Sequence, residues 1–496
     1  MSRDTGAFDA QGPVVTVGEH ALEGGILSMT EVLAQSVANM APSAAMALLP
    51  LLVFSSAGNG TWVSFVIAIV LMLCVGYCAA QFGRRINSAG SFYVWVSRAL
   101  GPAYGHAAGW GLELGYVATG VATVYGFAIF GGDLLTRLGL PGDSAGVLVV
   151  LFGIDLVLAA VVAILDMGLS ARMSLTLESF SVAIILLLCV AVWVHRGGVI
   201  DPAQLRLSGA TPGGVFVGVV LAIFAFVGFE SAGSLGVEAK NSFRNVPRAI
   251  LWSCLLVGLF YLVVSYSQVF GFQGTRRGLA GSSAPLPDLA VATGMGVFAY
   301  LIDLGIVTSM FACTLACLNA GARVLYAMTH DGLGHWTLGS VHPTRRTPHV
   351  AIVIVAIPMI LVPLATTLLR RSPVDATGWV GSLAVFGFML GYVLVAVGAP
   401  LFLRRLGVRS PLTWVVGLLG AAVMLFVFWA NSLPQSIPGR LFPPLQGVYE
   451  WLPLVFVAWV AVGAAYYAVW RWRNPEKART LGTRFHTPEG APATGD

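Results

Sequence analysis

The sequence feature that decides the fold is the stretch FAFVGFESAGSLGVEAKNSFRNVPRAI, which runs from Phe224 to Ile250. Its first part lies inside an apolar run at about 213–236, where glycines, serines and the carboxylate of Glu230 weaken a helix near the middle of the run. The first apolar run, at about 29–54, is interrupted in the same way by the segment NMAPSA at 39–44. There Pro42 cannot continue a helix, because it lacks an N–H donor, but it suits the first turn of a new one.

The whole chain has the composition of a polytopic α-helical membrane protein and not of a soluble globular one. Hydrophobic residues make up 57% of its 496 residues and charged residues only 10%, whereas an ordinary soluble domain carries roughly 25% charged residues. A spanning helix needs about 20 apolar residues, and about twelve runs reach that length. They lie at about 29–54, 62–83, 107–131, 145–165, 173–195, 213–236, 249–272, 296–329, 349–369, 378–401, 412–431 and 450–472. Because the runs are continuous and do not alternate, a β-barrel is excluded.

The two interrupted runs are the first members of two successive sets of five. Broken helices at matching positions of two halves are typical of secondary transporters built from inverted repeats, whose substrate site lies at the middle of the membrane between the breaks. The alternative is that Pro42 and the glycines only kink helices or allow close packing, as they often do in membrane helices. Two interruptions at matching positions favour the transporter interpretation.

Three stretches of the chain resemble the amino acid–polyamine–organocation (APC) superfamily. The stretch Phe224–Ile250 is similar to the signature of the sixth helix of that family. LNAGARVLYAMTHDGLGHWTLGSVHPTRRTPHVAI, at Leu318–Ile352, is similar to the eighth helix and the cytoplasmic loop that follows it. AGSFYVWVSRALGP, at Ala89–Pro102, is similar to the loop between helices 2 and 3. The resemblance implies an amino acid permease with a leucine-transporter-like fold.

The resemblance also implies how the all-α chain is divided. A ten-helix transport core at 28–401 has the inverted five-plus-five arrangement with helices 1 and 6 broken, and two peripheral helices follow at 402–472. Cytoplasmic tails are expected at 1–27 and 473–496. Many family members carry a Gly-x-Gly break in helix 1, where this chain has Met40-Ala41-Pro42-Ser43. The resemblance therefore defines the fold better than it defines the substrate.

The residues at the two breaks form the predicted substrate site. They are Met40, Ala41, Pro42, Ser43 and Ala44 in the first run and Phe226, Val227, Gly228, Phe229 and Glu230 in the sixth. The half-helix that starts near Pro42 presents free N–H groups and the positive end of its dipole, which suit a carboxylate. The first half of helix 6 ends in free carbonyls, which suit an ammonium. Phe226 and Phe229 pack either on the substrate or on lipid and other helices.

Five acidic residues lie inside predicted spans: Glu113, Asp155, Glu178, Glu230 and Asp303. Each costs about 2.5–3.5 kcal/mol at the centre of a helix, so each is expected to face the protein interior or water. Glu230 lies in the break, where it either serves as a gate, substrate or proton group or ties the unwound backbone by a hydrogen bond. For Glu113, Asp155 and Asp303, a place near a helix end or pairing with a neighbour is the preferred interpretation.

The resemblance further indicates residues that couple transport to an ion. In relatives with this fold, a side chain of helix 5 lies near the position where sodium-driven members bind sodium. Ser181 is expected at that place, with Glu178 one turn earlier. Thr308 and Ser309 of helix 8 offer hydroxyl groups to a cation, or else bond back to their own helix. Neither of the two lysines lies in a span, which excludes a helix-5 ammonium, and the loop at 238–248 is expected to form inner-gate contacts.

Other classes of function lack their usual residues. The net charge of +5 is too small and too spread out to suggest nucleic acid as a partner. The six cysteines lie in apolar runs without histidines, which predicts neither a metal site nor a disulfide. The chain has no phosphate-binding Gly-x-x-x-x-Gly-Lys loop, so no ATP-driven pump and no cofactor is expected. It also has no paired acids or His–acid motif of an intramembrane enzyme.

We therefore expect a secondary active transporter of an amino acid or related small amine, working by alternating access with protons or by exchange. A polyamine or organic-amine antiporter is the alternative within this class, and a channel or membrane sensor is the alternative from another class. The expected partners are the small-molecule substrate, a proton or another coupling ion, and the lipid bilayer. Of the 27 Lys and Arg residues, 19 fall on the side that carries the N-terminus. Both termini are therefore expected on the cytoplasmic side of the cell membrane.

Overall fold

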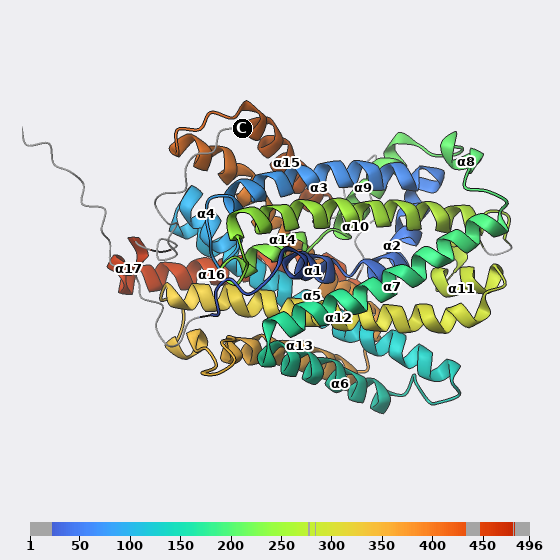
Figure 1. Cartoon of the computed structure of the whole chain (residues 1–496), viewed down its shortest axis with the longest axis horizontal. Helices are drawn as coiled ribbons and strands as arrows, with labels where there is room; N and C mark the ends of the chain where they lie inside the picture. The colour runs from blue at the N-terminus through green and yellow to red at the C-terminus, as the bar shows by residue number, and fades with distance from the viewer. Residues whose placement is uncertain (1–21, 276–277, 283, 433–446, 480, 482–496) are drawn as a thin grey trace, which may run out of the picture.

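Long helices run roughly side by side along the longest axis of the protein (Figure 1). The structure is a computed structural model that describes residues 22–275, 278–282, 284–432, 447–479 and 481. Most of the two predicted tails, at 1–27 and 473–496, lies outside the described residues. We call the end of the bundle that carries α4 (Phe92–Leu100) and α17 (Pro475–Arg479) the α4 end, on the left of Figure 1. The opposite end, with α8 (Pro202–Leu205) and α11 (Pro285–Ala292), is the α8 end.

The spanning helices follow the predicted runs closely. They are α1 (Met29–Met40) with α2 (Pro42–Ala57), α3 (Thr61–Gly83), α5 (Pro102–Arg137), α6 (Ala145–Leu165), α7 (Met167–His195), α9 (Pro212–Phe224) with the 3₁₀ helix η2 (Phe229–Leu235), α10 (Ser242–Phe272), α12 (Gly296–His330), α13 (His349–Leu368), α14 (Pro373–Arg405), α15 (Pro411–Ala430) and α16 (Leu452–Arg473). Short 3₁₀ turns are Gly58–Gly60, Leu279–Gly281, Trp336–Gly339 and Gly447–Glu450.

The number of membrane crossings agrees with the prediction of about twelve. The described residues contain 11 helical stretches that are long and apolar enough to span. One of them, Met29–Gly83, is 55 residues long and holds both the first broken helix and α3. Because one crossing takes about 20 residues, this stretch accounts for two.

Helix starts are set by local sequence. The hydroxyl of Ser28 accepts the N–H of Glu31, whose carboxylate accepts the N–H of Ser28, and this capping box begins α1. Prolines occupy the first helical position of several other helices, including Pro102 of α5 and Pro373 of α14, where no N–H is needed. These signals explain why sequence boundaries and structural boundaries agree within a few residues.

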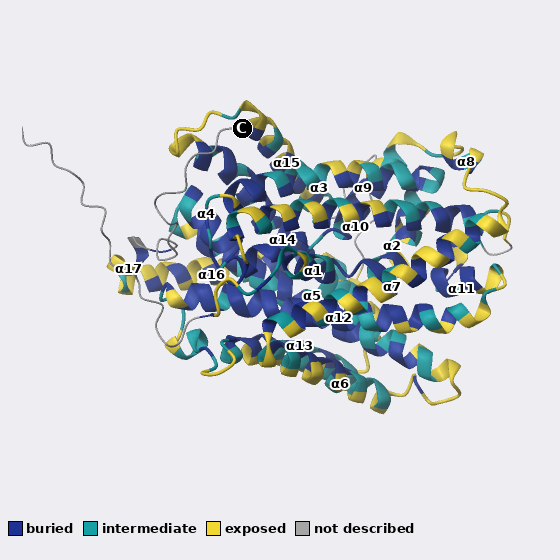
Figure 2. Ribbon diagram, viewed as in Figure 1, coloured by how far each residue is buried: buried dark blue, intermediate teal, exposed yellow. Residues whose placement is uncertain are grey.

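The most buried helix of the bundle is α12, which packs against α5 and α7. Of its most apolar segment, 78% of the residues are buried, compared with 28% for α6, α13 and α16. Figure 2 shows this gradient, with buried residues along the middle of the bundle and exposed ones on α6 and α13. The exposed residues of these outer helices are largely leucine, valine and isoleucine, as expected where a helix faces lipid.

Candidate functional site

The first break lies between α1 and α2. α1 ends at Met40, and Ala41 adopts a left-handed backbone conformation with a φ of 43°. The N–H of Ala41 still donates to the carbonyl of Ala38 (3.0 Å), and α2 begins directly at Pro42. One residue therefore separates two half-helices, at the place where the sequence predicts the interruption.

The second break lies between α9 and η2 and rests against the first. Gly228 has a φ of 99°, and a Cβ atom placed there would lie 2.4 Å from Nδ2 of Asn39. Only glycine fits both the conformation and the space. Nδ2 of Asn39 donates to the carbonyl of Gly228 (3.4 Å), and the hydroxyl of Ser36 donates to the carbonyl of Phe229 (2.7 Å). Side chains of α1 thus bind the unwound backbone of the sixth span directly.

A single hydroxyl joins the carbonyl ends of both broken helices. Tyr261 of α10 is fully buried, and its Oη lies 2.7 Å from the carbonyl oxygen of Ala225 and 3.3 Å from that of Met40. Its ring packs edge-on against Phe226, with centroids 5.2 Å apart. The sequence analysis does not single out Tyr261. Its one available signal was a phenol within an apolar run, and the same run also holds Tyr266 and Gln268.

The carboxylate of Glu230 is clamped by two tyrosines. Tyr116 of α5 donates to Oε1 (2.9 Å) and Tyr392 of α14 donates to Oε2 (2.7 Å), and all three side chains are fully buried. The hydroxyl of Tyr392 also accepts the N–H of Gly228 (3.1 Å). Glu230 therefore ties the second break to two other helices, and neither of its partners carries a charge.

The carboxylate of Glu178, on α7, lies at the start of α2. Its Oε1 accepts the N–H and the hydroxyl of Ser43, both at 3.3 Å, and the hydroxyl of Ser309 of α12 at 3.0 Å. Its Oε2 is buried without a hydrogen-bond partner, as is the hydroxyl of Ser181. Thr308 donates to the carbonyl of Gly305 in its own helix. Of the two α12 hydroxyls, at Thr308 and Ser309, only that of Ser309 bonds to the carboxylate of Glu178.

The other predicted site residues lie around the two breaks. Phe226 and Phe229 are fully buried, and Phe229 packs against the ring of Tyr392 with centroids 5.2 Å apart. Val227 and Ala44 are half-buried. The phenylalanines thus contact tyrosines of α10 and α14 and not lipid.

Of the five acids inside the predicted spans, three are not among the contacts described at the two breaks. Asp155 of α6 is fully buried and accepts the hydroxyl of Thr314 at 2.9 Å, and Thr314 is 2.9 Å from the hydroxyl of Thr123. Asp303, near the start of α12, forms an ion pair with Arg137 at the end of α5 (2.9 Å). Glu113 of α5 is half-buried.

A buried ion pair joins α12 to the segment that follows η2. Arg323 of α12 donates from Nε and Nη2 to the carboxylate of Glu238, which follows η2, at 2.5 and 2.7 Å. Both side chains are buried. Beside them, the backbone before α1 pairs with the backbone after η2, because the N–H of Leu27 donates to the carbonyl of Glu238 (2.9 Å) and the N–H of Lys240 donates to the carbonyl of Leu27 (2.8 Å). Arg323 lies within the predicted run at 296–329, and the structure buries it there inside the bundle.

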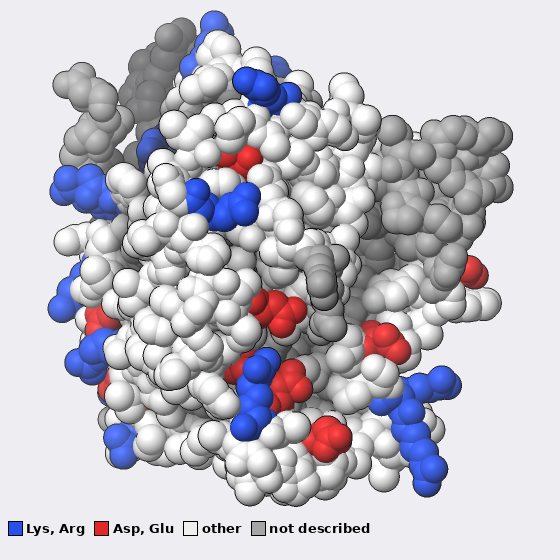
Figure 3. All heavy atoms as spheres, turned by 90° about the vertical axis from the view of Figure 1, so that its right-hand side faces the viewer, with Lys and Arg blue, Asp and Glu red and all other residues white. Residues whose placement is uncertain are grey.

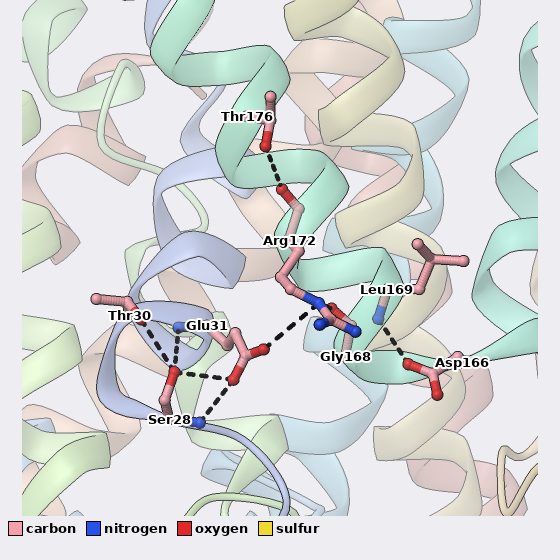
Figure 4. Close-up of polar contacts among 8 residues, drawn as sticks. All are labelled: Ser28, Thr30, Glu31, Asp166, Gly168, Leu169, Arg172 and Thr176. Carbon is pink, nitrogen blue, oxygen red and sulfur yellow. Dashed lines mark hydrogen bonds and ion pairs between the residues drawn. The ribbon is translucent and has the colours of Figure 1, made fainter.

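The start of α1 also contacts the start of α7, as Figure 4 shows. Oε1 of Glu31 lies 3.8 Å from Nε of Arg172, while the other oxygen of Glu31 accepts the N–H of Ser28 at 2.8 Å. Asp166 caps α7 through the N–H of Leu169 (2.6 Å). The side chain of Arg172 is 67% exposed, so this outer pair contributes little compared with the buried one.

The α8 end carries scattered charges separated by wide uncharged surface (Figure 3). A cavity of about 230 Å³ opens there between the ends of α7 and α10 and the end of α11. Its lining includes His195, Arg196 and Gln273, and none of the residues at the two breaks. Among the described residues, no three His, Cys, Asp or Glu side chains gather as a metal site would require.

Comparison with known proteins assigns the family. The family model for amino acid permeases matches residues 31–479. The chain belongs to the amino acid permease family. It is therefore a multi-pass membrane transporter and not an enzyme, and its membership of the APC superfamily is confirmed.

Individual relatives are more distant. The branched-chain amino acid permease BcaP of Bacillus subtilis is 28% identical over 60% of this chain, a match that spans 65% of the relative, just under two thirds of its length. BcaP of Lactococcus lactis subsp. cremoris is 25% identical over 77% of this chain and 84% of the relative. A solved structure of a Na⁺-coupled sialic acid symporter, in a substrate-bound outward-open state, matches this chain with a TM-score of 0.51 and 15% identity. The match covers 85% of this chain and 92% of that chain. At that identity the likeness shows the fold alone, and it confirms the leucine-transporter-like arrangement.

Proposed function

We propose that this protein is a secondary active transporter that moves an amino acid or a related small amine across the cell membrane by alternating access. The observation that carries the proposal is the contact between the two breaks. Half-helices of the first and sixth spans meet there, their carbonyl ends share the hydroxyl of Tyr261, and two buried carboxylates lie beside them. Broken helices that meet at the middle of the bundle are where transporters of this architecture hold their substrate.

The substrate contacts in this proposal are the residues of the breaks themselves. They are Met40, Ala41, Pro42, Ser43, Ala44, Phe226, Val227, Gly228, Phe229 and Glu230. The relatives include branched-chain amino acid permeases, which supports a small molecule with an amino group as substrate. The carbonyl ends of α1 and α9 also favour a charged amino group on the substrate, because the C-terminal end of a helix attracts positive charge.

Glu178 is the proposed coupling group, and Ser309 is its partner. Its carboxylate joins three helices, because it sits on α7 and accepts hydrogen bonds from α2 and α12. Protonation would remove the negative charge that holds these contacts and would loosen α2 from its neighbours. Ser181 and Thr308 are the other proposed coupling residues, although the hydroxyl of Thr308 bonds to the carbonyl of Gly305 in its own helix. Transport is thereby proposed to be driven by protons or by exchange.

The α4 end is proposed to face the cytoplasm, which places both termini there. This orientation puts 19 of the 27 Lys and Arg residues of the chain on the cytoplasmic side. It also makes the Arg323–Glu238 pair the inner gate. In this proposal the Arg323–Glu238 pair and the bond from Ser36 of α1 to the carbonyl of Phe229 in η2 hold the cytoplasmic side closed.

The test is uptake and countertransport in proteoliposomes, with a labelled panel of amino acids and amines and with or without a pH gradient. Accumulation of one compound that collapses with a protonophore supports proton coupling. Uptake that ignores the pH gradient but requires internal substrate supports exchange. Flux without countertransport would identify a channel, and the absence of any uptake by folded protein would overturn the proposal.

A further inference from the structure

The position where a substrate carboxylate would bind is already taken by a side chain of the protein. In transporters with broken helices, the N-terminal end of a half-helix points at the anionic group of the substrate. In this chain that end belongs to α2, and the carboxylate of Glu178 accepts both the N–H and the hydroxyl of Ser43 there. The positive end of α2 is therefore neutralised from within.

Few other donors remain at the start of α2. Pro42 has no N–H, and the N–H of Ala45 donates to the carbonyl of Ala41 at 2.8 Å. A substrate carboxylate would find at most the N–H of Ala44. It would also lie beside the negative charge of Glu178, and like charges in a buried site repel each other strongly.

The helix carbonyls and the second carboxylate at the breaks attract positive charge. The carbonyl ends of α1 and α9 meet at Tyr261, and Glu230 is held by two neutral hydroxyls. Among the described residues, Arg323 is the only buried lysine or arginine, and it is already paired with Glu238. Two buried carboxylates thus lie at the breaks without a basic partner. A buried charge needs a counter-charge, and a cationic substrate supplies one.

We infer that the substrate is an organic amine without a carboxylate, and that Glu178 is the residue that excludes carboxylate-bearing molecules. The inference rests on the proposed function and specifies its substrate. An ammonium group lies among the carbonyls and Glu230, while Glu178 stays ionised at the start of α2. A proton and the ammonium are alternative positive occupants of the same acidic region, which suits exchange of one for the other.

The test compares amino acids with the amines that differ from them only by loss of the carboxyl group. Leucine is paired with 3-methylbutylamine, and lysine with cadaverine. Binding to the purified full-length protein is measured by thermal stabilisation, and exchange by countertransport of the labelled compounds. For at least one pair the amine is expected to bind about tenfold more tightly than its amino acid or better, which corresponds to about 1.4 kcal/mol, and only the amine is expected to exchange.

The variant Glu178→Gln connects this selectivity to the residue. Glutamine keeps the shape but removes the charge, so the preference for the amine is expected to fall by about tenfold or more. A purely structural role would weaken both members of a pair alike. Asp155→Asn is the matched control, because Asp155 is an equally buried carboxylate outside the breaks. The Asp155→Asn protein should keep the preference of the parent for the amine over the amino acid. If Glu178→Gln does not fold, Ser309→Ala, which removes one hydrogen bond to Glu178, should shift the preference less but in the same direction.

The outcomes distinguish a failure of the amine substrate from a failure of the transporter function. Countertransport of leucine or lysine at least as fast as of the paired amine would overturn the inference and leave the proposed transporter standing. An amine preference that Glu178→Gln and Ser309→Ala both leave intact would overturn the role of Glu178. If folded protein exchanges no amino acid and no amine, the proposed function fails and the inference fails with it.

Discussion

Replacing Glu238 by glutamine leaves the guanidinium of Arg323 buried without its counter-charge. In the native protein the two side chains share two hydrogen bonds of 2.5 and 2.7 Å, and Arg323 has no exposed surface. Removing one partner of a buried ion pair costs about 3–5 kcal/mol, because the remaining charge is uncompensated. The closed conformation bears this cost, and opening the α4 end to water relieves it. The ratio of closed to open protein should therefore fall by between roughly 10²-fold and roughly 4 × 10³-fold.

Cys317 is a native reporter of this opening. It is fully buried, and its thiol donates to Oδ1 of Asn39 at the first break (3.1 Å). With the other five cysteines replaced by alanine, the rate of labelling by N-ethylmaleimide measures how often the α4 end opens. Glu238→Gln should label far faster than its parent, and the double variant with Arg323→Gln should return towards the parent rate. Equal rates for parent and single variant, both folded, would refute the reasoning, as would a double variant that labels like the single one.

Two further substitutions test the geometry of the breaks. Gly228→Ala places a Cβ atom 2.4 Å from Nδ2 of Asn39, in a backbone conformation that alanine disfavours. Initial uptake should therefore fall at least about tenfold at normal levels of protein in the membrane. The control Gly296→Ala adds a Cβ atom in open space and should leave uptake unchanged. Tyr261→Phe leaves two buried carbonyls without their donor and should lower the free energy of unfolding by about 1–3 kcal/mol. The control Tyr300→Phe changes an exposed tyrosine and should not lower it. Equal melting temperatures for the two variants would contradict the bridging role of Tyr261.

The spans and their interruptions could be read from the sequence because the signals are local. The run predicted at 145–165 is the helix Ala145–Leu165, and Pro42 and Gly228 interrupt their spans where their own backbone properties require it. α4 is a different case. It lies in a stretch that the sequence analysis treats as a loop, because nine residues are too few to register as a span. The spans and their two interruptions were predictable because each depends only on residues that are close together in the sequence.

The contacts between helices were not predictable, because apolar runs in a membrane show little difference between one face and another. Tyr261 bonds to Met40, which lies 221 residues earlier, and Tyr392 bonds to Glu230, 162 residues earlier. Hydropathy does not show that these side chains meet. For the same reason the sequence does not show that Arg323 pairs with Glu238, 85 residues earlier. The roles of the break residues and of Glu178 stay predictions that only transport measurements can test.

The position of Asp155 has a consequence for how the chain is made. Its hydrogen-bond partner Thr314 lies 159 residues further along, and synthesis at about 5–20 residues per second delays Thr314 by about 8–30 s. During that interval α6 must enter the bilayer with an acid near its centre, a position that costs about 2.5–3.5 kcal/mol. Every other residue of α6 is uncharged, and α6 packs against the preceding helix α5. Insertion of the fourth span therefore depends on its own apolar residues and on its neighbour, and the acid finds its final partner only when the eighth span arrives.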